Sequence, residues 1–176
     1  AARKIELIGD PETRYREDPV RILRAIRFAT KLNMQIAPAS AEPIAQLAVL
    51  LKNIPPPRLF DELVKLLLAG KAFDNFMLMR DSKVLKQLLT QLDKLLKQEP
   101  EGKAFQLATK ALQNTDERVE ADKPVTPAFI FAALLWYPVE LRSQMLITDG
   151  LSEIDAMNIA MTEVLDDIQR TIAIPK

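Results

Sequence analysis

The residue types best suited to chemistry in this sequence lie near its start. Glu17 and Asp18 form an acidic pair, and Arg21, Arg24 and Arg27 follow at intervals of three residues. A carboxylate can accept a hydrogen bond from a base amino group, and a guanidinium can donate one to a ring nitrogen. Asp18 and Arg21 could therefore read the Watson–Crick edge of adenine or cytosine. Guanine and uracil present the reverse pattern and would be rejected, because buried polar groups would stay unpaired.

A purely structural interpretation accounts for the same residues. Asp18 followed by Pro19 is typical of a helix start, with an N-cap and proline at the first helical position. Glu17 can then pair with Arg21 one turn later. Spacing alone favours this interpretation, since helix caps are common and nucleotide sites are rare. The two are compatible, because one carboxylate oxygen can cap the helix while the other faces a ligand.

The remaining charged residues of interest fall into two groups. Arg24 and Arg27 could hold a triphosphate or an RNA backbone, or they could lie on a solvated helix face. Arg58, Glu62 and Lys65 share one side of a later predicted helix. They could brace the first helix from behind, or form a surface ion pair worth about 0.3–0.5 kcal/mol. The sequence does not separate these alternatives.

A helix from about Asp18 to Leu32 must position the first group of charges. Ile22, Leu23, Ile26 and Ala29 share one face of that helix at 100° per residue, with the arginines roughly opposite. No segment alternates with period two, so the chain is predicted to be an all-α array of about eight to nine helices. Further helices are predicted over 40–53 with Ser40 as cap, 58–69, 72–79, 81–96, 104–112, 128–136, 138–147 and 152–172. An extended joint is predicted at Pro55–Pro57 and a loop over 114–127, and a domain boundary near residue 81 divides 1–80 from 81–176.

Composition excludes several kinds of active site. The 176 residues have zero formal net charge and include no cysteine and no histidine, which removes disulfides, thiol catalysis, Ser-His-Asp triads and most zinc sites. Neighbouring carboxylates at 61–62 and 166–167 diverge by about 100° on a helix, so no metal site is predicted. Phe129, Phe131, Trp136 and Tyr137 are expected to pack in the core. With no signal peptide or membrane-length apolar run, a cytoplasmic protein is expected.

The segment Leu7–Phe28, with its Glu-Asp-x-x-Arg element, resembles the class II template-independent nucleotidyltransferases, the family of bacterial poly(A) polymerases and CCA-adding enzymes. The resemblance implies that Asp18 and Arg21 read the nucleotide base and that Arg24 and Arg27 make further contacts with nucleotide phosphate, ribose or RNA. It also implies that Glu17, Arg58, Glu62 and Lys65 support this helix. No catalytic residue and no metal ligand is expected here.

The resemblance also implies an architecture. Residues 1–80 look like the neck, similar to the RNA- and SrmB-binding region of poly(A) polymerases, and 81–176 look like the helical body. The apolar segment 126–138 looks more like the poly(A) polymerase branch than the CCA-adding branch. The family's catalytic head, with its Gly-Ser motif, metal-binding aspartates and two Mg²⁺ ions, is expected to be missing at the N-terminal side. The chain alone is therefore expected to be inactive.

Three functions remain open at this point. The first is the base-recognition and RNA-supporting portion of an enzyme that adds AMP from ATP to RNA 3′ ends. The second is the same portion of a tRNA CCA-adding enzyme, because the Asp18–Arg21 pair accepts ATP and CTP alike. The third, from another class, is a helical protein-interaction module whose arginines bind an acidic partner. ATP, an RNA 3′ end and the catalytic head are the expected partners, and no membrane is expected.

Overall fold

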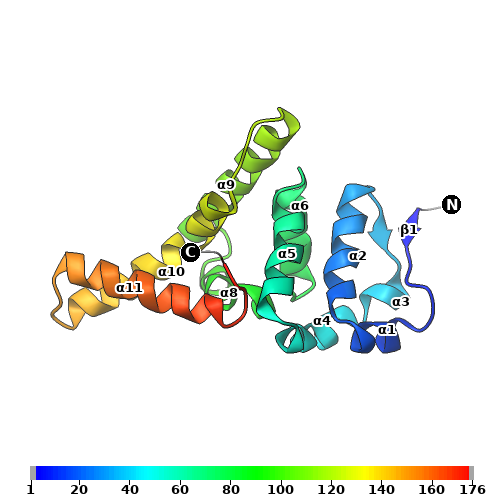
Figure 1. Ribbon diagram of the computed structural model, residues 1–176, viewed down its shortest axis with the longest axis horizontal. Helices are drawn as coiled ribbons and strands as arrows, with labels where there is room; N and C mark the ends of the chain where they lie inside the picture. Colours follow the sequence, from blue (N-terminus) through cyan, green and yellow to red (C-terminus); the bar gives the residue numbers. More distant parts are fainter. Residues whose placement is uncertain (1–2, 175–176) are drawn as a thin grey trace.

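The structure is a computed structural model that describes residues 3–174, and helices dominate that range (Figure 1). The α-helices are α1 (Pro11–Glu17), α2 (Val20–Lys31), α3 (Pro38–Ala41), α4 (Ile44–Leu47), α5 (Pro56–Leu67), α6 (Ala72–Asp81), α7 (Leu85–Leu88), α8 (Thr90–Gln98), α9 (Lys103–Glu120), α10 (Pro127–Thr148) and α11 (Glu153–Gln169), with a 3-10 helix η1 (Ala48–Asn53). The all-α fold class is confirmed. Two short strands, β1 (Lys4–Ile5) and β2 (Gln35–Ile36), form a parallel pair that was not predicted. Two residues per strand are too few to show an alternating pattern.

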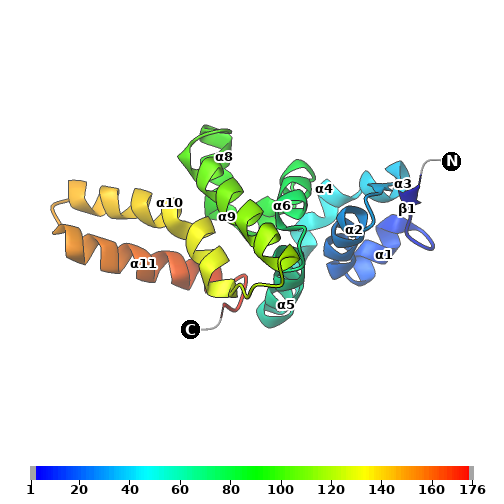
Figure 2. The same ribbon diagram turned by 90° about the horizontal axis from the view of Figure 1, so that it is seen from above.

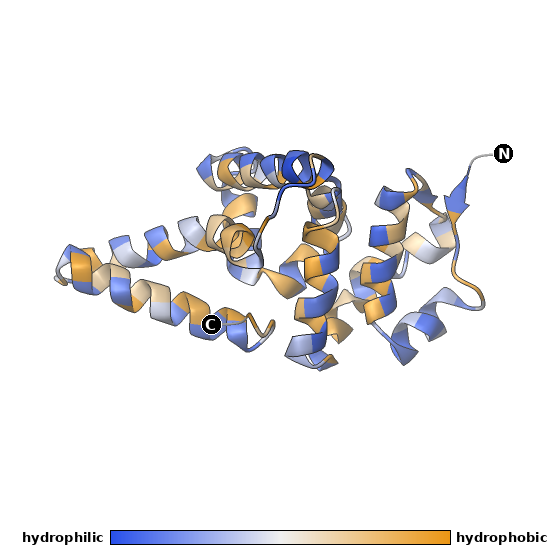
Figure 3. Cartoon of the chain, turned by 45° about the horizontal axis from the view of Figure 1, so that its top comes forward, coloured by the Kyte–Doolittle hydropathy of each residue, from blue (hydrophilic) through white to orange (hydrophobic). Residues whose placement is uncertain are grey.

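The first predicted helix has the expected buried face. Ile22, Leu23, Ile26 and Ala29 are all buried in α2. Beneath it, the Tyr15 side chain of α1 is fully buried, and its hydroxyl donates a hydrogen bond to the Ser40 carbonyl oxygen at 2.8 Å. Figure 3 shows that hydrophobic and polar residues alternate along most helices, so most helices can bury one side and expose the other. The charged side of α2 is thereby held outward.

The predicted helix over 40–53 is wrong in detail. Three short segments replace it, α3, α4 and η1. Pro38 starts α3, and Pro43 interrupts the chain because a proline nitrogen cannot donate a helical hydrogen bond. Ser40 is not a cap: it is buried, and its hydroxyl accepts a hydrogen bond from the Leu7 backbone N–H at 3.0 Å.

The prolines at 55–57 form an extended joint only at their first member. Pro55 has extended backbone angles, φ −55° and ψ 132°, whereas Pro56 and Pro57 begin α5. Proline is tolerated there because the first helical N–H groups have no partner within the helix. The predicted helix over 81–96 also divides: Asp81 ends α6 rather than starting a helix, and Lys83 takes a left-handed φ of 65° before α7.

Two predictions in the second half of the chain are wrong. The predicted loop over 114–127 is mostly helix, because α9 continues to Glu120. The predicted break before Pro138 is absent: Pro138 lies buried inside a single helix, α10. The aromatic residues there were all expected in the core, but Phe129 and Trp136 are about half exposed, while Phe131 is buried.

The elements form an elongated molecule (Figures 1 and 2). At one end α2, α5 and α6 pack side by side, and at the other α10 and α11 form an antiparallel hairpin that projects away from them. One hydrophobic cluster runs through both parts, from Tyr15 to Ile172. The domain boundary near residue 81 stays a prediction.

Candidate base-recognition site

Asp18 lies at the junction between α1 and α2. Its backbone is extended, with φ −147° and ψ 95°, and it ends α1. The predicted N-cap is shifted by one residue, since Pro19 occupies the N-cap position of α2. The Asp18 Oδ1 atom nevertheless accepts a hydrogen bond from the Val20 backbone N–H at 3.3 Å, so the side chain still serves an unpaired donor of the first helical turn.

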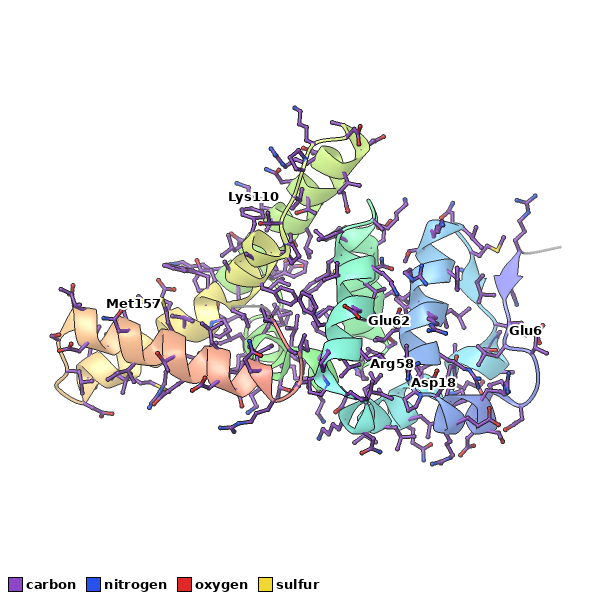
Figure 4. All side chains as sticks on the ribbon, in the orientation of Figure 1. Glu6, Asp18, Arg58, Glu62, Lys110 and Met157 are labelled. Atoms are coloured by element: carbon purple, nitrogen blue, oxygen red, sulfur yellow. The ribbon has the colours of Figure 1, made fainter. Side chains whose placement is uncertain are left out.

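The other oxygen of Asp18 is held by an arginine from a distant part of the chain. Arg58 Nη2, on α5, donates to Asp18 Oδ2 at 2.8 Å (Figure 4). The Asp18 side chain is 22% exposed. Burial raises the pKa of Asp18, but the hydrogen bond and charge of Arg58, the Val20 N–H and the charge of Arg24 together outweigh it, so the pKa lies below its ordinary value. Asp18 is therefore fixed, ionised at neutral pH and accessible from solvent.

Arg21 is oriented by two acceptors from α1. Its Nη1 donates to Glu17 Oε2 at 2.9 Å and to the Arg14 carbonyl oxygen at 3.0 Å. Arg14 Nη1 also donates to the same Glu17 oxygen at 2.9 Å. The hydrogen bond from Arg21 is the chief reason that the pKa of Glu17 lies below its ordinary value. The Arg21 side chain is 31% exposed, so the guanidinium is both anchored and accessible.

Arg24 faces a buried acid on the neighbouring helix. Glu62, on α5, has a side chain only 5% exposed, and its Oε1 lies 3.6 Å from Arg24 Nη2 and 3.2 Å from Lys65 Nζ. Its Oε2 is buried without a hydrogen-bond partner among the described residues. Figure 4 shows Glu62 on the side of α5 that faces α2. Glu62 thus holds Arg24 against α5 while about half of the arginine side chain stays exposed.

Arg27 has a different environment. Its guanidinium carbon lies 4.8 Å from the centre of the Phe28 ring, and its Nε atom is buried without a hydrogen-bond partner among residues 3–174. An arginine over an aromatic face gains a favourable cation–π contact. The Phe28 ring therefore partly covers the Arg27 guanidinium, and the Arg27 Nε–H group has no acceptor among residues 3–174.

The structure brings most of the predicted site residues together where α1, α2 and α5 meet. Arg58 contacts Asp18, and Glu62 contacts Arg24, so α5 lies behind the charged side of α2. Sequence reasoning missed the part played by Arg14, which shares Glu17 with Arg21. Its spacing of three residues before Glu17 was the available signal. The arrangement offers a fixed acceptor and fixed donors on one accessible surface.

The described residues show two further negative features. Within residues 3–174 no group of three or more acidic, histidine or cysteine side chains converges in a way that could hold a metal ion. Over the same part of the chain, each helix is too short or too polar to span a bilayer.

Comparison with known proteins finds a matching family and several relatives. Residues 33–96 match the family described as the probable RNA and SrmB-binding site of polymerase A. Poly(A) polymerase I of Salmonella typhi is 46% identical over 173 residues, which is 98% of this chain and 37% of that protein. The chain is homologous to part of bacterial poly(A) polymerase I. The same protein of Haemophilus influenzae is 46% identical over 99% of the chain and 39% of its own length.

Other relatives match a shorter segment. A CCA-adding enzyme of Limosilactobacillus fermentum is 46% identical over 71 residues, which is 40% of this chain and 18% of that enzyme. The poly(A) polymerases match nearly the whole chain, so the resemblance to their branch extends through the helical body. The chain nevertheless spans less than two fifths of the length of these poly(A) polymerases. A solved structure titled "Structure of tRNA-processing enzyme complex 3" is a distant likeness, at 18% identity and a TM-score of 0.47 over 98% of the chain.

Proposed function

We propose that this chain is the base-recognition and RNA-supporting portion of a poly(A) polymerase, which transfers AMP from ATP to the 3′ end of RNA. The observation that carries the proposal is the fixed pair at the α1–α2 junction. Arg58 holds Asp18, and Glu17 with the Arg14 carbonyl holds Arg21. Side chains held by such supporting contacts present their hydrogen bonds in one geometry.

The pair would select adenine through its hydrogen-bonding edge. Each carboxylate oxygen can accept more than one hydrogen bond, so Asp18 can take the adenine amino group while Arg58 stays bound. Arg21 uses Nη1 for its anchors and would donate to the ring nitrogen through its remaining N–H groups. Arg24 and Arg27, further along α2, would contact nucleotide phosphate, ribose or RNA. Water that leaves the site on binding would strengthen these hydrogen bonds.

The chemical step would belong to a part of the enzyme outside this chain. Mg²⁺ with ATP would supply the phosphoryl-transfer chemistry in a catalytic head, and the donors and acceptors on α2 would orient the base. We expect the chain alone to extend no RNA primer when given ATP and Mg²⁺. Measurable extension by these residues would show that the portion described here is catalytically complete. ATP and RNA as substrates are consistent with a cytoplasmic location.

The experiment that tests base recognition uses the full-length enzyme that contains this chain. Incorporation of ATP, GTP, CTP and UTP onto an RNA primer is measured for the Arg21→Ala variant. The preference for ATP over GTP should fall about 10- to 100-fold, because one good base contact is worth about 1–3 kcal/mol of discrimination. The Lys71→Ala variant, with its exposed pair on Asp74, is the control and should keep the preference. Equal loss for all four nucleotides would contradict base reading.

The two other functions make different predictions. A CCA-adding enzyme is supported by matches to part of the chain and would use CTP as well as ATP, so the two nucleotides in direct competition distinguish it. A protein-interaction module would lose its partner in an Arg21→Ala and Arg24→Ala double variant while nucleotide incorporation by the full-length enzyme stayed unchanged.

A further inference from the structure

Phe28 is an aromatic side chain that lies exposed on α2, two turns after Arg21. It is 41% exposed, whereas the other large hydrophobic residues of α2 are buried. Arg21, Arg24 and Phe28 follow one another at i, i+3 and i+7, a spacing that places them in a row along one side of a helix. The side of α2 that presents hydrogen-bond donors thus continues as an aromatic surface.

The neighbouring arginine holds the Phe28 ring from one side. The guanidinium of Arg27 lies over the ring, in a favourable cation–π contact. The exposed part of the ring remains available to a second flat group. Unstacked bases of single-stranded RNA pack in this way on aromatic rings and on guanidinium planes.

The charges around Phe28 suit a ligand that carries phosphates. Arg24 lies one turn before Phe28 and Lys31 one turn after it, and both side chains are exposed. From residue 19 to residue 41 the sequence contains no aspartate and no glutamate. Glu62 reaches α2 from α5, but its side chain is buried and faces Arg24. A base that stacked on Phe28 would therefore find cations for its phosphates on the same helix.

Two other aromatic residues are comparably exposed within residues 3–174, and their surroundings differ. Phe129 and Trp136 both lie on α10. In the hairpin of α10 and α11, from 127 to 170, acidic residues outnumber basic ones. An RNA phosphate would meet carboxylates on that hairpin. Of the three exposed aromatic residues, Phe28 is the one with the charge environment that single-stranded RNA requires.

We propose that Phe28 is a stacking site for a base of the single-stranded RNA primer, with Arg24 and Lys31 on the adjoining phosphates. The inference rests on the proposed function, because the primer must approach the nucleotide that Asp18 and Arg21 hold. Phe28 lies seven residues beyond Arg21, which is about 10 Å along a helix. One base cannot reach both side chains over that distance, so Phe28 would hold a neighbouring base rather than the incoming one.

The test measures how a single-stranded oligoadenylate binds to the intact chain. One base near its 3′ end is replaced by the fluorescent adenine analogue 2-aminopurine, whose emission changes when its stacking changes. Phe28→Leu removes the ring but keeps an apolar side chain, and it should weaken binding at least about fivefold. Phe28→Trp should keep the binding and the change of emission, because tryptophan also presents a flat aromatic face. The salt dependence should stay that of wild type in both variants, because Phe28 neutralises no phosphate.

A matched substitution controls for the change of side chain. Phe129 is 50% exposed on α10, and Phe129→Leu should leave the affinity for the oligoadenylate unchanged. Circular dichroism shows whether each variant folds. In the full-length enzyme, Phe28→Leu should raise the KM for the RNA primer and leave the preference for ATP over GTP intact, whereas Arg21→Ala should lower that preference. Base recognition at Arg21 and stacking at Phe28 can therefore fail separately.

Three results would overturn the proposal. The first is equal weakening in Phe28→Leu and Phe28→Trp, which would show that the flat ring is not what binds. The second is a loss of affinity in Phe129→Leu as large as in Phe28→Leu. The third is an unchanged RNA affinity in Phe28→Leu together with a lower melting temperature of the full-length enzyme, which would identify another part of that enzyme as the surface that covers Phe28.

Discussion

Asp18 links three parts of the molecule through one carboxylate. Its two oxygens contact Val20 at the start of α2 and Arg58 on α5, and the residue itself ends α1. Its folded pKa lies below the ordinary value of 3.8. The stability that this ionised carboxylate contributes is therefore present above the unfolded pKa and is lost as the pH falls through the folded pKa. Both the site geometry and the packing of α2 on α5 depend on the contact with Arg58.

We predict that Arg58→Gln lowers the free energy of unfolding by about 0.5–1 kcal/mol at neutral pH, because the pair is partly exposed. The difference from wild type should vanish in acid, once Asp18 is protonated. Urea unfolding at neutral pH and in acid measures this difference. Lys71→Gln, which removes a more exposed pair with Asp74, should change stability by less. A difference for Arg58→Gln that persists in acid would mean that the arginine acts by packing rather than by charge.

Tyr15 gives a second pH-dependent prediction. Burial raises the pKa of its hydroxyl from 10.0 to about 12. A pKa that is raised on folding contributes stability below the unfolded value, and that stability is lost as the pH rises toward 12. In Tyr15→Phe the alkaline loss of stability should be shallower than in wild type, measured by urea unfolding. Tyr137→Phe is the control because Tyr137, the other tyrosine, is not buried. Equal alkaline slopes in wild type and Tyr15→Phe would contradict the prediction.

At the scale of elements, α6 begins with a cap that comes from another helix. Asp116 of α9 accepts hydrogen bonds from the Ala72 N–H at 2.7 Å and the Phe73 N–H at 3.1 Å. A carboxylate at a helix N-terminus pairs the free N–H groups and interacts favourably with the helix dipole. The start of α6 is thus tied to α9 across more than forty residues of sequence.

We predict that Asp116→Ala destabilises the chain by about 1–2 kcal/mol, because it leaves two partly buried backbone donors unpaired. Asp116→Asn should recover part of the loss, since an amide oxygen can still accept one hydrogen bond. Glu117→Ala, at the next and exposed position of α9, should have little effect. Denaturant unfolding of the three variants measures whether their free energies of unfolding follow this order. Equal stability of Asp116→Ala and Glu117→Ala would show that the cap is energetically unimportant.

The sequence predicted those elements whose pattern is local. The buried face of α2 followed from Ile22, Leu23, Ile26 and Ala29, and Ser152 was placed at the start of the last helix, where it accepts from the Asp155 N–H. Elements decided by distant contacts were missed. Ser40 looked like a cap, but its hydroxyl is used by Leu7 from outside its own helix.

The same limit applies to the site. The sequence predicted the pair of Glu17 and Arg21 from their i, i+4 spacing on one helix. The pair forms at 2.9 Å, although Glu17 ends α1 and Arg21 lies on α2. The acidic partner of Arg58 could not be predicted from spacing. Glu62 lies one turn away on the same helix, but Arg58 pairs with Asp18 at the α1–α2 junction. Glu62 instead turns inward toward Arg24. Tertiary packing of α5 on α2 decides between these partners, and local spacing carries no information about it.

At the scale of the whole molecule, a chain of zero net charge separates its charges. The acidic hairpin of α10 and α11 lies at one end, and the arginines of α2 lie toward the other. Electrostatic attraction for RNA phosphates should therefore be local to α2, because charges further apart than about 10 Å are largely screened at ordinary salt. Net charge alone would predict no such attraction.

This separation predicts how RNA binding responds to salt. For a single-stranded oligoadenylate bound to the chain, the slope of log K against log salt should weaken by about 0.7 for each phosphate that the protein no longer neutralises. Arg24→Gln and Arg27→Gln should each flatten the slope by about that amount. Lys110→Gln is the control with the same change of charge, because Lys110 lies on α9, well away from Asp18 (Figure 4). If Lys110→Gln flattened the slope as much as Arg24→Gln, the RNA would be held by diffuse charge, and α2 would have no special part in binding it.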